Sequence, residues 1–75
     1  MTIEKIRSFR NAQPFKPFDI LTKDGGKVHV ALPERIALAP DGEMLGVYEG
    51  SVPHFLEVAA ITGLRTTRKR KRRSG

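Results

Sequence analysis

The sequence has no cysteine and no tryptophan, and only one tyrosine and two methionines among its 75 residues. Without cysteine, neither a disulfide nor a thiolate metal site can stabilise the fold. No apolar run approaches the roughly 20 residues that a membrane-spanning helix needs. The first residues also lack the apolar segment of a secretory signal peptide. We therefore expect a cytoplasmic protein without membrane partners.

The short length limits the size of the core. A chain of this size forms one domain and buries only about 60% of the surface that it exposes when unfolded. Hydrophobic residues make up 39% and charged residues 29% of the sequence, which is typical of a globular protein. A small core can hardly enclose a substrate pocket. We therefore expect neither an enzyme nor a small-molecule substrate.

Positive charge is concentrated at the C-terminal end of the chain. The net charge is +6, but residues 1–64 hold seven bases and all eight acids, which gives −1. Residues 65–75 hold the other seven bases and no acid: Arg65, Arg68, Lys69, Arg70, Lys71, Arg72 and Arg73. A segment with such dense like charge and no apolar residue does not fold by itself. We predict one domain over residues 1–67 and a disordered basic tail over residues 68–75.

A short helix is predicted at the N-terminus, over residues 2–12. Thr2 is a suitable N-cap, and Ile3, Ile6 and Phe9 recur at helical spacing on one face. Pro14 then ends the helix, because the residue before a proline avoids the helical conformation. In the connector that follows, we expect Phe15 and Phe18 to cover one end of a sheet.

The rest of the chain has the alternation of β-strands. The run Asp24-Gly25-Gly26 favours a tight turn between a strand that begins at Phe18 and a return strand over residues 27–32. A second turn is expected at residues 40–42. Further strands are predicted over residues 36–38, 44–48, 54–58 and 64–67, with a short helical turn at residues 59–63. The fold class is mostly β (α+β by count): a helix followed by a five- or six-stranded antiparallel bent sheet or small barrel.

Two resemblances accompany this pattern. Residues 13–20, Asp24-Gly25, Pro33-Glu34 and residues 40–42 form the pattern QPFxPFxI, DG, PE and PDG, which resembles a group of small bacterial proteins of uncharacterised activity. That resemblance covers nearly the whole body of the chain and implies no particular reaction.

The second resemblance is to the Sm-like small β-barrels, which include bacterial RNA chaperones. Residues 18–25 are similar to the first strand and turn of those proteins, and residues 57–62 are similar to the turn that joins their last two strands. It implies a short helix followed by a five-stranded bent sheet. Near the last turn, where an RNA-contact motif is expected, residues 55–60 contain an acid and no base. SH3-like barrels and other combinations of a helix with a sheet therefore remain alternatives.

Residues that carry chemistry are few and scattered. His29 and His54 are 25 positions apart, and we interpret both as strand residues on the face opposite their apolar neighbours. A zinc site needs about four closely spaced ligands, and no pair of acids suits general acid–base catalysis. Gly25-Gly26 indicates a turn, since no phosphate-binding signature follows it. We predict no catalytic residue, metal or cofactor.

The basic tail supports the leading functional hypothesis. A run of bases binds RNA or DNA through phosphate neutralisation, so Arg65 and residues 68–73 are the candidate nucleic-acid-binding residues. An acidic protein, an anionic lipid surface, or no specific partner would suit the same tail. The main alternative is a protein-interaction or self-assembly module that uses a strand edge or an exposed Phe15/Phe18 surface.

Overall fold

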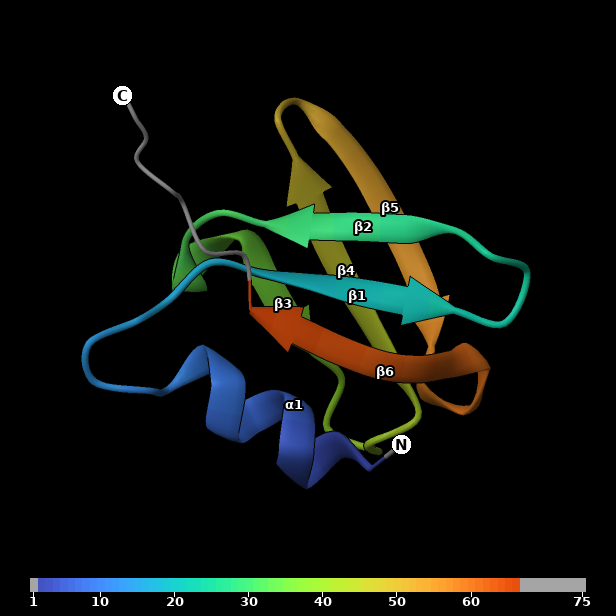
Figure 1. The fold of residues 1–75 in the computed structure, drawn as a ribbon. Helices are drawn as coiled ribbons and strands as arrows, with labels where there is room; N and C mark the ends of the chain where they lie inside the picture. The colour runs from blue at the N-terminus through green and yellow to red at the C-terminus, as the bar shows by residue number, and fades with distance from the viewer. Residues whose placement is uncertain (1, 67–75) are drawn as a thin grey trace.

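The structure is a computed structural model that describes residues 2–66 (Figure 1). In this part of the chain, an α-helix and six strands are joined by tight turns and two short 3-10 helices. The elements are α1 (Ile3–Arg10), β1 (Phe18–Thr22), β2 (Lys27–Val30), η1 (Pro33–Arg35), β3 (Ile36–Leu38), β4 (Met44–Glu49), β5 (Val52–Glu57), η2 (Val58–Ala60) and β6 (Ile61–Thr66).

The strands form two antiparallel sheets of three strands each. Sheet A has the order β2-β1-β6, and sheet B has the order β3-β4-β5. The predicted class is confirmed: an N-terminal helix is followed by antiparallel strands in a mostly β fold. Over the described residues the two sheets remain separate ladders, so the strands do not close into a barrel.

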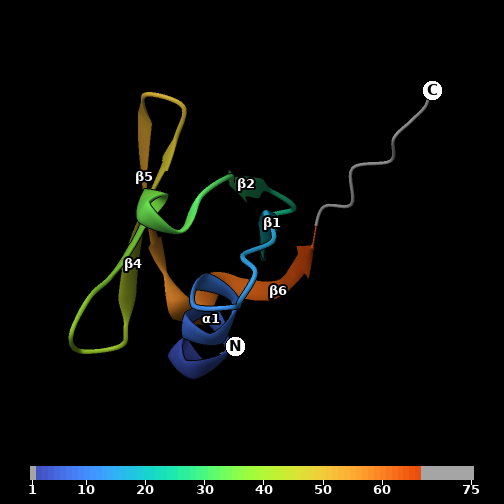
Figure 2. The same ribbon diagram turned by 90° about the vertical axis from the view of Figure 1, so that its left-hand side faces the viewer.

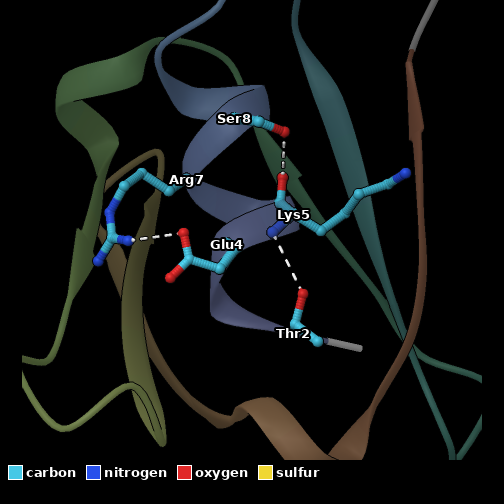
Figure 3. A network of polar contacts seen from close by, with 5 residues as sticks. All are labelled: Thr2, Glu4, Lys5, Arg7 and Ser8. Carbon is cyan, nitrogen blue, oxygen red and sulfur yellow. Dashed lines mark hydrogen bonds and ion pairs between the residues drawn. The ribbon is translucent and has the colours of Figure 1, made fainter.

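Polar contacts on one side of α1 fix its first turns (Figure 3). The hydroxyl of Thr2 accepts a hydrogen bond from the backbone N–H of Lys5 at 3.4 Å, which confirms Thr2 as the N-cap. Arg7 and Glu4 form an ion pair at 3.3 Å, and the hydroxyl of Ser8 donates to the carbonyl of Lys5 at 2.8 Å. Such contacts support a helix that is too short to be stable alone.

The apolar side of α1 attaches the helix to the sheets. Ile6 is completely buried, and Ile3 and Phe9 pack against the core as the spacing predicts. The ring of Phe9 meets the ring of Phe18 edge to face, with centroids 5.2 Å apart. The helix ends at Arg10, two residues before the predicted end, because its last turn closes in a cap at Asn11.

The first hairpin follows the sequence pattern closely. Phe18 pairs with Val30 and Ile20 with Val28, so all four side chains point into the core. Gly25 has a φ of 87°, a conformation that favours glycine. The return strand predicted over residues 27–32 is shorter than expected: β2 ends at Val30, and Leu32, which is 44% exposed, lies where the chain turns into η1.

Sheet B and β6 are longer than predicted. The strand predicted over residues 54–58 begins at Val52, directly after a two-residue turn, and runs through Pro53. A proline is tolerated there because β5 is an edge strand of sheet B. The predicted helical turn is only the 3-10 helix η2, so β6 begins at Ile61, three residues before the predicted start at residue 64.

The core lies between the sheets and α1. Its most completely buried large side chains are Ile6, Phe18, Ile20 and Val30, and sheet B adds Ile36, Leu45 and Val47. Phe15 is only partly buried and packs beside Phe18. The expected exposed Phe15/Phe18 surface is therefore absent from the described residues, because Phe18 is used as a core residue.

Among the described residues, no helix is both long enough and apolar enough to cross a membrane.

Candidate functional site

Arg65 is the one predicted nucleic-acid-binding residue that the structure describes. It lies near the end of β6, is exposed, and is in register with Asp19 of β1. The other six, Arg68, Lys69, Arg70, Lys71, Arg72 and Arg73, lie outside the described residues, as does the predicted domain boundary after residue 67.

Arg65 belongs to the outer surface of sheet A. Strand side chains alternate between the two faces of a sheet, and Phe18, Ile20, Val28 and Val30 occupy the inner face. The registers then place the intervening residues on the outer face. We call this surface the sheet A face: Asp19, Leu21, Lys27, His29, Gly63 and Arg65.

The carboxylate in the middle of the sheet A face is engaged by a histidine. Nδ1 of His29 lies 2.8 Å from Oδ1 of Asp19, and the Asp19 side chain is only 13% exposed. Lys27 and Arg65 lie on the two flanking strands and are exposed. The exposed charge of this face is therefore mainly positive.

A second histidine–carboxylate pair joins the two sheets. Nε2 of His54 lies 3.1 Å from Oε1 of Glu49 in sheet B, and the other oxygen of Glu49 accepts the backbone N–H of His29 at 3.2 Å. Glu49 thus satisfies a donor on the edge of β2, which limits further pairing at that edge. His29 lies on the face opposite the buried Val28 and Val30, as predicted. The prediction is wrong for His54, which shares the inner face of sheet B with Leu56 and is the cross-strand partner of the buried Val47.

The sequence analysis missed these pairs, although one of them had a signal. Asp19 alternates with Phe18 and Ile20, and His29 with Val28 and Val30, so the alternation alone indicates that both lie on the outer face of one hairpin. The observed register, centred on Asp24, then makes them direct cross-strand partners. His54 and Glu49 are diagonal neighbours within the β4–β5 hairpin. The bond from His29 to Glu49, in contrast, depends on how sheet B packs against β2, which no local pattern gives. Over residues 2–66, no group of three or more histidine, aspartate or glutamate side chains is placed to hold a metal ion.

The outer surface of sheet B is different in character. We call it the sheet B face: Ala37, Met44, Gly46, Tyr48, Pro53, Phe55 and Glu57. Phe55 is 77% exposed and Tyr48 55% exposed. The Phe55 ring lies against Gly46, where an added Cβ would be 3.6 Å from two ring carbons. The small residues Ala37 and Gly46 leave a hollow of about 240 Å³ beside the two aromatic rings.

Acidic residues border the sheet B face. Glu57 lies on it, Glu34 lines the hollow, and Glu43 lies beside Met44 at another concave part of the surface. The base at the hollow is Arg35, whose guanidinium donates to the carbonyl of Gly50 at 3.0 Å. Acids therefore predominate on the sheet B face itself, while Lys23 and Lys27 lie across a wider groove that Phe55 also lines.

The sequence pattern suggests that Tyr48 and the four phenylalanines are mostly core residues, which is correct for Phe18, Phe9 and Phe15 but wrong for Tyr48 and Phe55. Leu56 and Leu45 fill the inner phase of the hairpin, which leaves Phe55 in the outer phase with Glu57. The sequence does contain a signal for the exposure of Phe55. Residues two positions apart in a strand lie on the same face of the sheet, so Phe55 is expected to share the face of the charged Glu57.

Comparison of the chain with known protein families, with curated proteins and with solved structures gives no match.

Proposed function

We propose that this chain is a non-enzymatic nucleic-acid-binding protein whose basic C-terminal segment and sheet A face contact phosphate groups. The observation that carries the proposal is the separation of charge: residues 65–75 contain seven bases and no acid. Each base that neutralises a phosphate releases counterions, so such a segment provides affinity without needing a folded partner surface.

The position of Arg65 supports a role for the sheet A face. Arg65 lies on that face and begins the basic segment, and Lys27 is exposed on the same face at the opposite strand. Asp19 adds little repulsion, since its carboxylate is nearly covered and bonded to His29. A phosphate backbone can therefore extend from the tail over sheet A.

Phosphate contacts carry no sequence information by themselves. The exposed aromatic rings that could stack on bases lie on the other sheet, beside acidic residues. We therefore expect binding that depends weakly on sequence and strongly on salt.

Titration of the full chain with a fluorescent single-stranded RNA and a duplex DNA, across a salt series, tests the proposal. If about five bases engage, log affinity falls against log salt with a slope near −3.5 for the single strand and −4.5 for the duplex. A full-length variant with glutamine at all six basic positions from 68 to 73 is expected to lose most of this binding. Absent binding, or affinity that does not change with salt, would contradict the proposal.

Matched single substitutions separate the two faces. Lys27→Gln and Arg65→Gln are each expected to make the duplex slope shallower by about 1, because each removes one phosphate contact. Arg35→Gln is the control, since it removes a base of the sheet B surface. An Arg35→Gln effect as large as the other two would mean that the sheet A face has no special role.

A further inference from the structure

The outer edge of β5 is a surface that nucleic-acid binding does not use. In sheet B, β5 pairs only with β4, so its other side is the end of the described ladder. Figure 2 shows β5 at the left of the fold, whereas β6, whose last residues include Arg65, runs from the lower end of β5 to the right-hand side. An edge of this kind presents unpaired peptide groups to any extended chain.

The direction of these peptide groups follows from the register. The N–H of Val58 donates to the carbonyl of Glu43 at 2.8 Å, and hydrogen-bonded and non-hydrogen-bonded pairs alternate along an antiparallel ladder. Positions 53, 55 and 57 are then non-hydrogen-bonded, so their backbone groups point to the free edge. Pro53 has no N–H, which leaves Phe55 and Glu57 as the residues that offer both a donor and an acceptor.

The same two residues also carry the exposed side chains of this strand. Phe55 lies between two concave surfaces: the hollow above Gly46, and a wider groove between β5 and the β1–β2 hairpin. The groove is bordered on the β5 side by His54, Leu56 and Glu57, and on the hairpin side by Lys23, Asp24 and Lys27. A chain that pairs with β5 would therefore have its peptide groups at the edge and its side chains in these two depressions.

The chemistry of this surface restricts the occupant. Glu34, Glu43 and Glu57 repel phosphate groups, and they would repel the same surface of a second copy. The protein's own C-terminal segment has no apolar residue after Leu64, so it has no apolar side chain to place beside Phe55. An apolar ring bordered by acids instead suits a segment that has an apolar and a basic side chain.

We propose that the free edge of β5 binds an extended segment of another protein, which adds to sheet B as a further strand. Side chains two positions apart lie on one face of a strand. The segment therefore places an apolar residue beside Phe55 and a basic residue beside Glu57, in an apolar-x-basic pattern. This mode of recognition combines main-chain hydrogen bonds for affinity with side-chain depressions for specificity.

The test uses the isotope-labelled full chain and two synthetic peptides. In the first peptide, threonines occupy every second position, and the positions between them carry valine and lysine on the opposite face of the strand, in the apolar-x-basic pattern. The second peptide is identical except that glutamate replaces lysine. We expect the lysine peptide to shift the backbone amides of Phe55 and Glu57, to protect them from hydrogen exchange, and to bind at least about fivefold more tightly than the glutamate peptide, as opposite and like charges across strands require.

Three variants sharpen this result. Phe55→Gln is expected to weaken binding of the lysine peptide about tenfold, and Glu57→Lys to reverse the preference between the peptides. Val52→Gln is the matched control, because Val52 is an exposed apolar residue of β5 that lies on the opposite face. It should bind like the unchanged protein. All three positions are exposed, and the amide spectrum of each variant checks that it is folded.

Other outcomes overturn the proposal. Equal affinity for both peptides, or shifts confined to sheet A, would exclude this edge. Concentration-dependent shifts of Phe55 in the free protein would identify a second copy as the occupant, and Phe55 shifts with a single-stranded RNA would identify bases. The variant with glutamine at positions 68–73 is expected to keep peptide binding, so failure here and failure of nucleic-acid binding are distinguishable.

Discussion

The two sheets of this molecule have similar ladders and opposite outer surfaces. At the centre of the sheet A face, Asp19 is bonded to His29, and the exposed residues around it are basic. At the centre of the sheet B face, Gly46 has no side chain, and the ring of Phe55 rests on it. The body of the chain therefore has two distinct surfaces, although its net charge of −1 suggests a featureless one.

The largest expected effect compares the same residue type in two environments. Phe18 is fully buried and Phe55 is 77% exposed. Phe18→Ala should lower the free energy of unfolding by about 3–5 kcal/mol, since it leaves a cavity in the core. Phe55→Ala should change it by no more than about 0.5 kcal/mol. Urea unfolding monitored by circular dichroism measures both.

A loss above about 1 kcal/mol for Phe55→Ala would contradict the distinction. Phe55 would then be a structural residue that stabilises sheet B, and the sheet B face would lose its main candidate anchor. The partly buried Phe15 serves as an intermediate control, because it contacts the ring of Phe18 at a centroid distance of 6.0 Å.

The sequence predicts sheet A better than sheet B for a physical reason. In the first hairpin, the turn residues fix the register, and valine and isoleucine identify the inner face without ambiguity. In β5, both phases contain apolar residues: Phe55 in one and Leu56 in the other. Alternation alone cannot decide which phase is buried, and the packing of Leu56 near the core decides it.

The candidate residues show the same limit. The concentration of bases after residue 64 is evident from the sequence, and so is the shared outer face of Asp19 and His29, although their exact pairing depends on the register that the turn adopts. The free edge of β5 is not evident from the sequence, because it depends on which strand edges remain unpaired after the two sheets have formed. Strand order is a property of the whole fold, and local patterns predict only neighbours along the chain.

An intermediate effect is expected for the two histidine–carboxylate pairs. Asp19 is 13% exposed, whereas the Glu49 side chain is 42% exposed. Asp19→Ala should cost about 1–2 kcal/mol of stability, since it removes a hydrogen bond that is largely shielded from water. Glu49→Ala should cost less than about 1 kcal/mol, as exposed pairs do.

Thermal unfolding of both variants at neutral pH checks this order. The opposite order would mean that the link from Glu49 to His29, which joins sheet B to the edge of β2, contributes more than the pair within sheet A. The stability of the fold would then depend more on the contact between the two sheets than on the histidine–aspartate pair of the sheet A face.

The smallest expected effect concerns the turns that close the two hairpins at Asp24 and Asp41. The hydroxyl of Thr22 donates to the Asp24 carboxylate, and so does the backbone N–H of Gly26 at 3.0 Å. The Thr22 bond is the main reason why the pKa of Asp24 is lowered, with the Gly26 N–H adding to it. Asp41 instead accepts one backbone N–H, from Glu43 at 2.9 Å.

The sign of the pH dependence follows from the direction of the Asp24 shift. Because the pKa is lower in the folded chain, the ionised carboxylate stabilises the fold above its ordinary value of 3.8, and this stabilisation disappears as the pH falls through the folded-state pKa. Asp24→Asn keeps an acceptor oxygen and removes the charge. We expect it to lower the melting temperature slightly near neutral pH, and this difference should disappear as the pH falls through the folded-state pKa of Asp24. Asp41→Asn is the matched control, and an equal pH-dependent difference there would assign the effect to the loss of any acid rather than to the Thr22 hydrogen bond.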